Sequence, residues 1–182
     1  IARRQRQMCI RDRHKIGEVH NIDPNRIICG AGSDEMIQLL CRCFCEQNDE
    51  VIYTEHGFLM YKLSALAAGA KPIEVKERNR TASVKNICAA ITAKTKMIFL
   101  ANPNNPTGTM ISEDEIEKLL NKIPSNILLV LDGAYSEYVD SFDGGISLAN
   151  KFGNLFVTRT FSKIYALGLS LIHISEPTRL RR

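Results

Sequence analysis

The chain has 182 residues, of which 45% are hydrophobic and 24% are charged, and its formal net charge is +4. This length suits one domain or a large piece of one, and it is sufficient for a sizeable buried core. The sequence contains no apolar run of the roughly 18 residues that a membrane-spanning helix needs, and no secretory signal is visible in it, so neither a membrane-spanning nor a secreted protein is indicated.

The excess positive charge lies at the two ends of the chain. Residues 1–13 and 169–182 hold eight of the 24 basic residues but only two of the 20 acidic ones. The segment between them therefore has 16 basic and 18 acidic residues, which is a net charge of −2. That balance does not indicate a surface for nucleic acid.

Both ends resemble translated DNA adapters of the kind used in sequencing libraries. Residues 3–13, RRQRQMCIRDR, match the translation of a transposon adapter, and residues 169–179, LSLIHISEPTR, match that of the partner adapter read inward. Two facing matches favour the interpretation that residues 14–168 are natural protein, and that residues 1–13 and 169–182 derive from adapters. The alternative is a natural basic amphipathic arm and tail.

Helical and strand patterns alternate between residues 14 and 168. In chain order, we expect a helix over 33–44, a strand over 51–54, a helix over 58–68, a strand over 72–75, a helix over 84–93, a strand over 97–101, a helix over 113–122, a strand over 127–131 and a last strand over 155–158. The strands are almost continuously apolar, as in sheets that are covered on both faces. The pattern predicts an α/β fold with a mostly parallel sheet flanked by helices.

Local signals mark the ends of three of these helices. Ser33 can cap the first helix, and Asp34 and Glu35 suit the positive end of its dipole. Gly69 is a typical terminator for the second helix. The run SEDE at 112–115 has the pattern of a capping box and should begin the helix that follows it.

Five cysteines lie between residues 14 and 168, and three of them, Cys41, Cys43 and Cys45, alternate in one short run. Positions i and i+2 of a helix point to different faces, and no second cysteine pair or nearby histidine completes a zinc set. We therefore expect no metal site but buried free thiols, which are typical of a protein in the reducing cytoplasm.

Polar side chains follow the ends of several of the expected strands. Asn105, Asp132 and Lys163 each lie just past such an end, and Tyr135 follows three residues after Asp132. Ligands of parallel α/β sheets bind at the carboxyl ends of the strands. A lysine, an aspartate, an asparagine and a tyrosine that meet there predict a site for pyridoxal 5′-phosphate.

Each of these side chains has a group that this cofactor requires. The amine of Lys163 can form an imine with the aldehyde and can then move the proton at the substrate Cα. The carboxylate of Asp132 can keep the pyridine nitrogen protonated. Asn105 and Tyr135 have groups that can donate to the phenolic oxygen. Taken singly, each has an ordinary alternative: a solvated surface lysine, or polar residues of turns.

The cofactor phosphate is expected at the start of the first helix, where backbone N–H groups are available. The residues expected around it are Gly32, Ser33, Asp34, Thr160 and Ser162. Phe58, near the start of the second helix, is expected to stack on the cofactor ring. Its alternative is plain core packing.

Four runs, in this order and spacing, resemble the fold-type I pyridoxal-phosphate aminotransferases: GAGSDE at 30–35, NPNNPTG at 102–108, DGAY at 132–135 and TFSK at 160–163. Among these enzymes, the chain is most similar to the histidinol-phosphate aminotransferases. The resemblance spans residues 14–168 and implies part of the large, cofactor-binding domain.

For the site, the resemblance implies covalent attachment at Lys163, pairing of Asp132 with the ring nitrogen and contacts from Asn105 and Tyr135 to the phenolic oxygen. The catalytic residues would be Lys163, Asp132 and Tyr135. The reaction implied is transfer of the amino group of histidinol phosphate to 2-oxoglutarate, in histidine biosynthesis. Such enzymes are homodimers with the site near the interface.

The chain departs from the family pattern at three places. Gly133 stands where relatives often have Glu. The run GLSL at 168–171 lacks the arginine of the Gly-Leu-Arg run that grips the phosphate in relatives. The third departure is that we expect the chain to lack the small C-terminal domain and the N-terminal arm of the family. Because the second departure coincides with the start of the adapter match, we interpret it as truncation.

Three alternatives stay open. One is another enzyme with the same cofactor site, such as an aromatic aminotransferase or a threonine-phosphate decarboxylase. A second is an inactive fragment of a larger gene product. The third is a dinucleotide-binding domain, suggested by the GAG run at 30–32; the usual fingerprint disfavours it, because it needs glycine where Glu35 stands.

Overall fold

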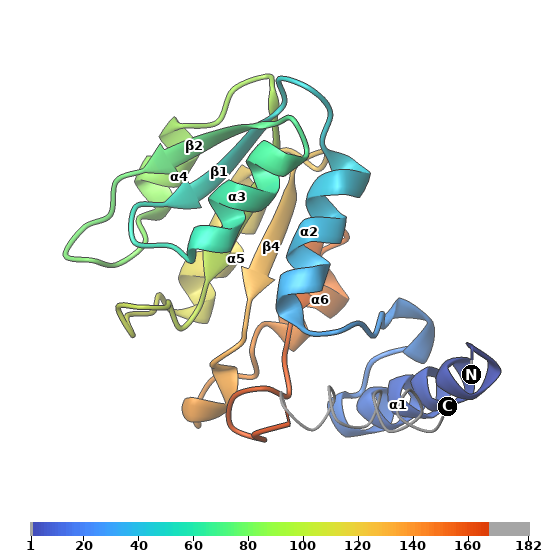
Figure 1. Ribbon diagram of the computed structural model, residues 1–182. Coiled ribbons are helices and arrows are strands. Elements are labelled where there is room, and N and C mark those ends of the chain that lie inside the picture. The colour runs from blue at the N-terminus through green and yellow to red at the C-terminus, as the bar shows by residue number, and fades with distance from the viewer. Residues whose placement is uncertain (1, 168–182) are drawn as a thin grey trace.

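The computed structural model describes residues 2–167 and has a five-stranded sheet between two layers of helices (Figure 1). The strand order is β2-β1-β3-β4-β5, and every neighbouring pair is parallel. The strands are β1 (Glu50–Thr54), β2 (Lys71–Val75), β3 (Thr95–Ala101), β4 (Leu128–Asp132) and β5 (Leu155–Thr158). The expected α/β fold with a parallel sheet is confirmed.

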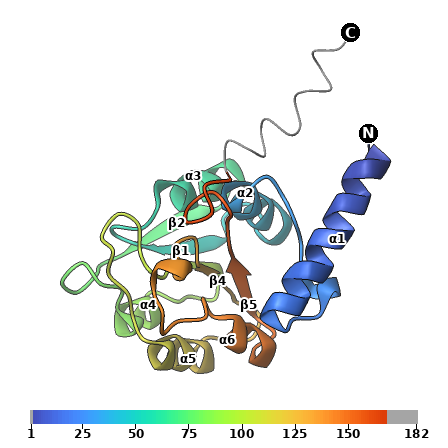
Figure 2. The same ribbon diagram turned by 90° about the horizontal axis from the view of Figure 1, so that it is seen from below.

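Six α-helices and two short 3₁₀ turns are present in the described part of the chain. They are α1 (Ala2–His20), η1 (Pro24–Arg26), α2 (Ser33–Phe44), α3 (Leu59–Ala67), α4 (Val84–Ala89), α5 (Glu113–Lys122), η2 (Ser136–Tyr138) and α6 (Ile146–Lys151). Seen from below, α2 and α3 cover one face of the sheet and α4, α5 and α6 cover the other, while α1 projects away from both layers (Figure 2).

The alternation of side chains along the strands produces two separate cores. Val51, Met97 and Phe99 point to the α2–α3 face, where they pack with Ile37 and Tyr61. The strand residues that alternate with these three point to the α4–α5–α6 face. The buried side chains on that face include Ile52, Ile98, Leu100, Ile116 and Leu119. Because the central strands are buried on both faces, they are apolar at successive positions.

Parallel strands place all their carboxyl ends at one edge of the sheet. The loops that leave this edge follow Thr54, Ala101, Asp132 and Thr158. The start of α2 lies at the same edge, since residues of its first turn share a cavity with residues of these loops. The fold therefore brings five segments that are far apart in sequence to one place.

Two details of the helix ends differ from the sequence-based expectation. Ser33 is the first residue of α2 rather than its cap, because Gly32 occupies the N-cap position with a φ of 108° that favours glycine. The helix that was expected over 84–93 is α4, and it stops at Ala89. The Thr95 hydroxyl accepts the backbone N–H of Thr92 at 2.9 Å, and this turn directs the chain into β3.

Helices α1 and α6 were not expected from the sequence. Helix α6 is short, and Asp143 begins it by accepting the backbone N–H groups of Gly145, Ile146 and Ser147. Residues 2–13, interpreted above as adapter-derived, lie in α1. The segment 169–182 and the run at 168–171 lie outside the described residues.

The cysteine run divides between the interior and the surface. Cys41 and Cys45 are buried in the core below α2, but Cys43 is exposed, and Cys29 and Cys88, elsewhere in the chain, are half-buried. The expectation of buried thiols is therefore confirmed for Cys41 and Cys45 and was wrong for Cys43. The reason is the helix geometry itself, because a residue two positions from a buried one faces away from the core. Within residues 2–167, no helix is long and apolar enough to cross a membrane.

The expected capping box is present at the start of α5. The Ser112 hydroxyl accepts the Glu115 backbone N–H, and the Glu115 carboxylate accepts the Ser112 backbone N–H, both at 3.3 Å. We predict that Ser112→Ala lowers the free energy of unfolding by about 1 kcal/mol, measured by urea denaturation. Ser125→Ala, in an exposed turn, is the control and should change it by less than about 0.5 kcal/mol. Equal effects of the two substitutions would contradict the role of the cap.

Candidate active site

A cavity of about 90 Å³ lies at the carboxyl edge of the sheet. It is lined by Ser33, Asp34, Phe58, Tyr61, Ala101, Pro103, Asn105, Asp132, Ala134, Tyr135 and Lys163. Seven of the ten site residues expected from the sequence are in this set. The other three, Gly32, Thr160 and Ser162, line a second cavity of about 260 Å³.

Asp132 is the last residue of β4 and is only 5% exposed. Its Oδ1 accepts hydrogen bonds from the backbone N–H of Ala134 at 3.2 Å and from the hydroxyl of Thr158 at 3.0 Å. Its Oδ2 accepts a hydrogen bond from the hydroxyl of Tyr61 at 2.6 Å. Burial raises the pKa of Asp132 above its usual range, and the bonds from Tyr61 and Thr158 act in the opposite direction.

Tyr61 is the site residue that sequence reasoning missed. It comes from α3, is 1% exposed, and its ring stacks on Phe99 with a centroid distance of 4.7 Å. Burial, followed by the charge of Asp132, raises the pKa of the Tyr61 phenol well above its ordinary value, so the hydroxyl remains a donor. The available signal was a tyrosine within an apolar helix, because a buried phenol needs a hydrogen-bond partner.

The Asn-Pro loop that carries Asn105 is held by its own side chains. Asn102 is 1% exposed; its amide donates to the backbone O of Ile111 at 3.1 Å and accepts the Ile111 N–H at 2.9 Å. The amide of Asn104 donates to the backbone O of His56 at 3.1 Å and to the hydroxyl of Thr107 at 2.8 Å. These bonds fix the loop on both sides of Asn105.

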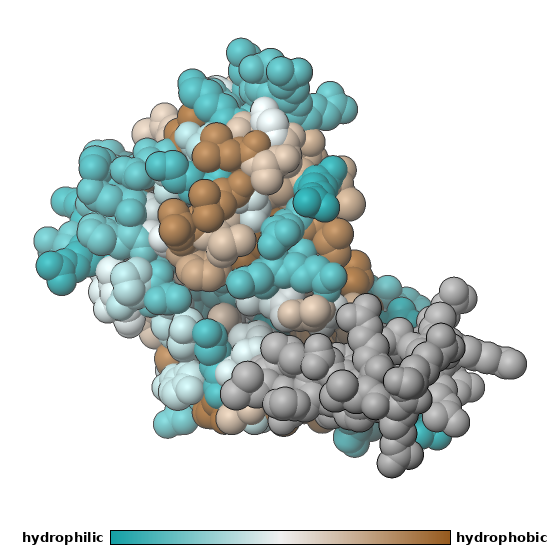
Figure 3. All heavy atoms as spheres, viewed as in Figure 1, coloured by the Kyte–Doolittle hydropathy of each residue, from teal (hydrophilic) through white to brown (hydrophobic). Residues whose placement is uncertain are grey.

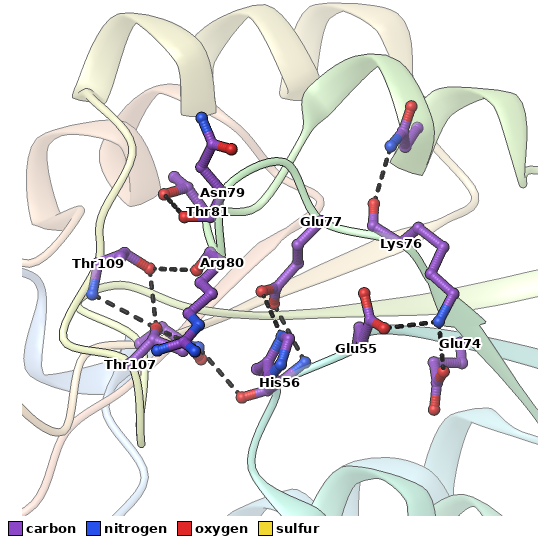
Figure 4. A network of polar contacts seen from close by, with 12 residues as sticks. Glu55, His56, Glu74, Lys76, Glu77, Asn79, Arg80, Thr81, Thr107 and Thr109 are labelled. Carbon is purple, nitrogen blue, oxygen red and sulfur yellow. Dashed lines mark hydrogen bonds and ion pairs between the residues drawn. The ribbon is translucent and has the colours of Figure 1, made fainter.

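A polar network ties this loop to the two loops beside it (Figure 4). His56 is bonded through Nδ1 and through its backbone N–H to the carboxylate of Glu77, whose side chain is 2% exposed. Thr109 donates to the backbone O of Arg80 at 2.6 Å. Because His56 is two residues before Phe58, the network fixes the loops that present Phe58 and Asn105 to the cavity.

Lys163 reaches the cavity from the segment after β5. Its Nζ lies 5.3 Å from the ring centroid of Tyr135, and its side chain is exposed. The turn that carries it is closed by the Ser162 backbone N–H, which donates to the Thr160 hydroxyl at 3.1 Å. The lining of the cavity thus includes an exposed amine, a buried carboxylate, an amide and a phenol.

This donor set fits pyridoxal 5′-phosphate. An exposed lysine can condense with an aldehyde, and a buried carboxylate is stabilised by a cationic ring nitrogen next to it. The amide of Asn105 and the phenol of Tyr135 can donate to an anionic oxygen. No cluster of three or more residues able to hold a metal ion is found in the part of the chain that the structure describes.

Known proteins resemble this chain in sequence and in structure. The family model "Aminotransferase class I and II" matches residues 7–168. Histidinol-phosphate aminotransferases of a Ruegeria species and of Cereibacter sphaeroides are 60% and 56% identical to it over 156 residues. These alignments cover 86% of this chain but only 43% of the relatives, so the chain spans less than half of their length.

Solved structures of aminotransferases also resemble this chain. The histidinol-phosphate aminotransferase of Sinorhizobium meliloti, in complex with pyridoxal-5′-phosphate, matches 85% of this chain and 43% of its own with a TM-score of 0.79 and 26% identity. A putative histidinol-phosphate aminotransferase of Erwinia carotovora atroseptica matches 89% of this chain and 49% of its own with a TM-score of 0.82 and 27% identity. The resemblance inferred from the four sequence runs is confirmed for the family and the fold.

The raised pKa of Asp132 predicts a specific pH dependence of stability. A group whose pKa is higher in the folded state contributes stability below its unfolded pKa of about 3.9, and this contribution is lost as the pH rises through the folded value. A neutral side chain in place of Asp132 does not ionise, so the stability that is lost at higher pH in the unsubstituted chain is retained in the variant. We therefore predict that Asp132→Asn raises the Tm of the cofactor-free chain more at neutral pH than at pH about 4.

Asp143→Asn is the matched control, with the opposite sign. Burial acts to raise the pKa of Asp143, but the hydrogen bonds from Ser147, Gly145 and Ile146 lower it overall. Its contribution is present above the unfolded pKa and is lost as the pH falls, so Asp143→Asn should cost more stability at neutral pH than at low pH. Parallel pH profiles for the two variants would show that Asp132 is not held in a desolvated site.

Proposed function

Because the chain belongs to the class I and II aminotransferases, we propose that it is the cofactor-binding part of a pyridoxal-phosphate-dependent aminotransferase. The observation that carries the proposal is the meeting of Lys163, Asp132, Asn105 and Tyr135 at one small cavity. The chain spans 43% of the curated relatives, so the activity is proposed for a longer protein that contains it. The 182-residue chain alone should bind the cofactor weakly and turn over little or no substrate.

When bound, pyridoxal 5′-phosphate supplies an aldehyde that reacts with amines and a ring that withdraws electrons. Lys163 would hold the cofactor at its aldehyde through the side-chain amine, and the same amine could move the proton at the substrate Cα. Asp132 would keep the ring nitrogen protonated, since its buried carboxylate is fixed by three hydrogen bonds.

The remaining residues bind and orient. Asn105 and Tyr135 would donate to the phenolic oxygen, and Phe58 would cover one face of the ring. The start of α2 and the turn before Lys163 would hold the phosphate, since backbone N–H groups and hydroxyls are available there. The residues assigned to it are Gly32, Ser33, Asp34, Thr160 and Ser162. Gly32, Thr160 and Ser162 line the second cavity, and Ser33 and Asp34 line the first.

The proposed amino donor is histidinol phosphate and the proposed acceptor is 2-oxoglutarate, in cytoplasmic histidine biosynthesis. The names of the relatives at 56–60% identity support the donor. The described residues have the groups that amino-group transfer requires, and none of them has a group whose chemistry selects an imidazole ring.

The proposed cofactor attachment is tested by reduction with borohydride in the presence of pyridoxal 5′-phosphate, followed by peptide mass spectrometry. We predict that the peptide containing Lys163 carries most of the added mass. Lys163→Ala should remove this label, whereas Lys62→Ala, at an exposed position of α3, should not. Label that is spread evenly over the lysines, or that is unaffected by Lys163→Ala, would argue against the site.

In the full-length protein, Lys163→Ala should lower the rate of transamination by at least about 100-fold, because it removes the group that moves the Cα proton.

In the same full-length protein, Asp132→Asn should retain the borohydride label at Lys163 but strongly reduce turnover. Near-normal turnover of Asp132→Asn would mean that another group keeps the ring nitrogen protonated.

The full-length protein is proposed to be a homodimer. Leu59, Leu63 and Leu66 are 62%, 45% and 52% exposed, and their spacing places them on one side of α3. Apolar side chains gather over this helix on the face seen in Figure 3. The stripe begins one residue after Phe58, which lines the cavity, and this supports an interface close to the site.

Leu63→Glu should convert the full-length dimer into a monomer, measured by light scattering after gel filtration, because it introduces a charge into the buried interface. Met110→Glu, at a partly exposed apolar residue of a loop, should leave the dimer intact. A dimer that survives Leu63→Glu would exclude this face of α3 from the interface.

A further inference from the structure

We propose that Tyr61 is a positioning residue for Asp132: its hydroxyl fixes the direction of the carboxylate and favours its ionised form. The proposal deepens the proposed function and rests on it, because Asp132 is assigned there to the ring nitrogen of the cofactor. None of the four motif runs includes Tyr61, which precedes Asp132 by 71 residues in sequence.

The Tyr61 ring has little freedom to move. It stacks on Phe99 with an interplanar angle of 1°, and Phe58 packs against its edge at a centroid distance of 5.8 Å. Its backbone N–H donates to the backbone O of Phe58 at 3.1 Å at the start of α3. The phenolic oxygen is therefore placed by the helix and by two aromatic rings, rather than by its bond to Asp132.

The carboxylate of Asp132 is held through both of its oxygens. Thr158 and the backbone N–H of Ala134 donate to Oδ1, and Tyr61 alone donates to Oδ2 in the hydrogen bonds of the site. The bonds to Oδ1 come from β5 and from the loop after β4, on one side of the group. The Tyr61 bond comes from α3, in the layer that covers the sheet, and prevents the carboxylate from rotating about its Cβ–Cγ bond.

Charge gives the Tyr61 bond a second role. Burial favours the protonated form of Asp132, and the charge of Asp34 at the start of α2 acts in the same direction by raising the pKa of Asp132. Tyr61 and Thr158 are the side chains whose hydrogen bonds oppose this effect. Lys163 is the basic residue among those that line the same cavity. A protonated Asp132 could not balance a cationic ring nitrogen, so loss of the Tyr61 bond should weaken the function assigned to Asp132.

The same tyrosine links the two groups that face the ring. Phe58 contacts the edge of Tyr61, and Tyr61 donates to Asp132. The side chain proposed to cover the ring face and the one proposed to bind the ring nitrogen are thus both in contact with Tyr61.

Tyr61→Phe tests the proposal because it keeps the stacked ring and removes only the hydroxyl. The measurement is the titration of Asp132 in the cofactor-free chain by NMR of carboxyl-labelled aspartate, with the signal assigned through Asp132→Asn. We expect the proton affinity of Asp132 to increase about tenfold in Tyr61→Phe, since a hydrogen bond to a charged group is lost. An unchanged titration would overturn the proposal.

Tyr53→Phe is the matched control. Tyr53 is also buried, and its hydroxyl also donates to a carboxylate, that of Glu74 at 3.3 Å, but it does not line the cavity. The Asp132 titration should be the same in Tyr53→Phe as in the unsubstituted chain. A shift of equal size in both variants would indicate a general effect of losing a buried hydroxyl, and would also overturn the proposal.

A second measurement needs no substitution in α3, so it remains decisive if Tyr61→Phe does not fold. The Tyr61 hydroxyl proton should exchange slowly with water, and its NMR signal should move as Asp132 titrates. Absence of such a signal would refute the bond. Borohydride labelling at Lys163 separates this result from the proposed function: no label with an intact Tyr61–Asp132 coupling would remove the cofactor assignment and leave the bond established.

Discussion

The buried carboxylate of Asp132 is the constraint on which the rest of the site depends. A charge this far from water is stable only when hydrogen-bond donors surround it. The donors come from α3, from β5 and from the loop after β4, so three separate parts of the chain must meet correctly for the charge to be tolerated. In the cofactor-free chain burial still raises the pKa of Asp132. A cationic ring nitrogen in the cavity would lower that pKa, because it stabilises the ionised carboxylate.

The parallel sheet is what makes this meeting possible. With all strands in one direction, the loops that carry Phe58, Asn105, Asp132 and Lys163 leave the same edge, although they are spread over more than a hundred residues of sequence. The polar network around His56 and Glu77 then joins neighbouring loops to one another. The sheet sets the approximate positions of the site residues, and the side-chain bonds between the loops set their final ones.

Much of this arrangement could be predicted from the sequence. The apolar strands predicted the sheet, and residues just past strand ends predicted which side chains would share a cavity. Gly32, Thr160 and Ser162 were assigned to the phosphate from the N–H groups of a helix start and from hydroxyl chemistry, and their roles stay predictions, as does the origin of the two terminal segments. Tyr61 and Thr158 could not be predicted as partners of Asp132, because a hydrogen bond between residues 71 or 26 positions apart leaves no local pattern. Helix α6 was missed since its start depends on Asp143 and a glycine pair, which read as a turn.

The central claim is that Asp132 faces the ring nitrogen of pyridoxal 5′-phosphate and keeps it protonated. The most direct measurement is the ¹⁵N NMR shift of the cofactor, labelled at the ring nitrogen and bound to this chain, compared with the Asp132→Asn variant. The account predicts a protonated nitrogen at neutral pH in the unsubstituted chain and an unprotonated one in Asp132→Asn. A bound cofactor whose ring nitrogen is unprotonated in the unsubstituted chain, or whose protonation is the same in both, would contradict it.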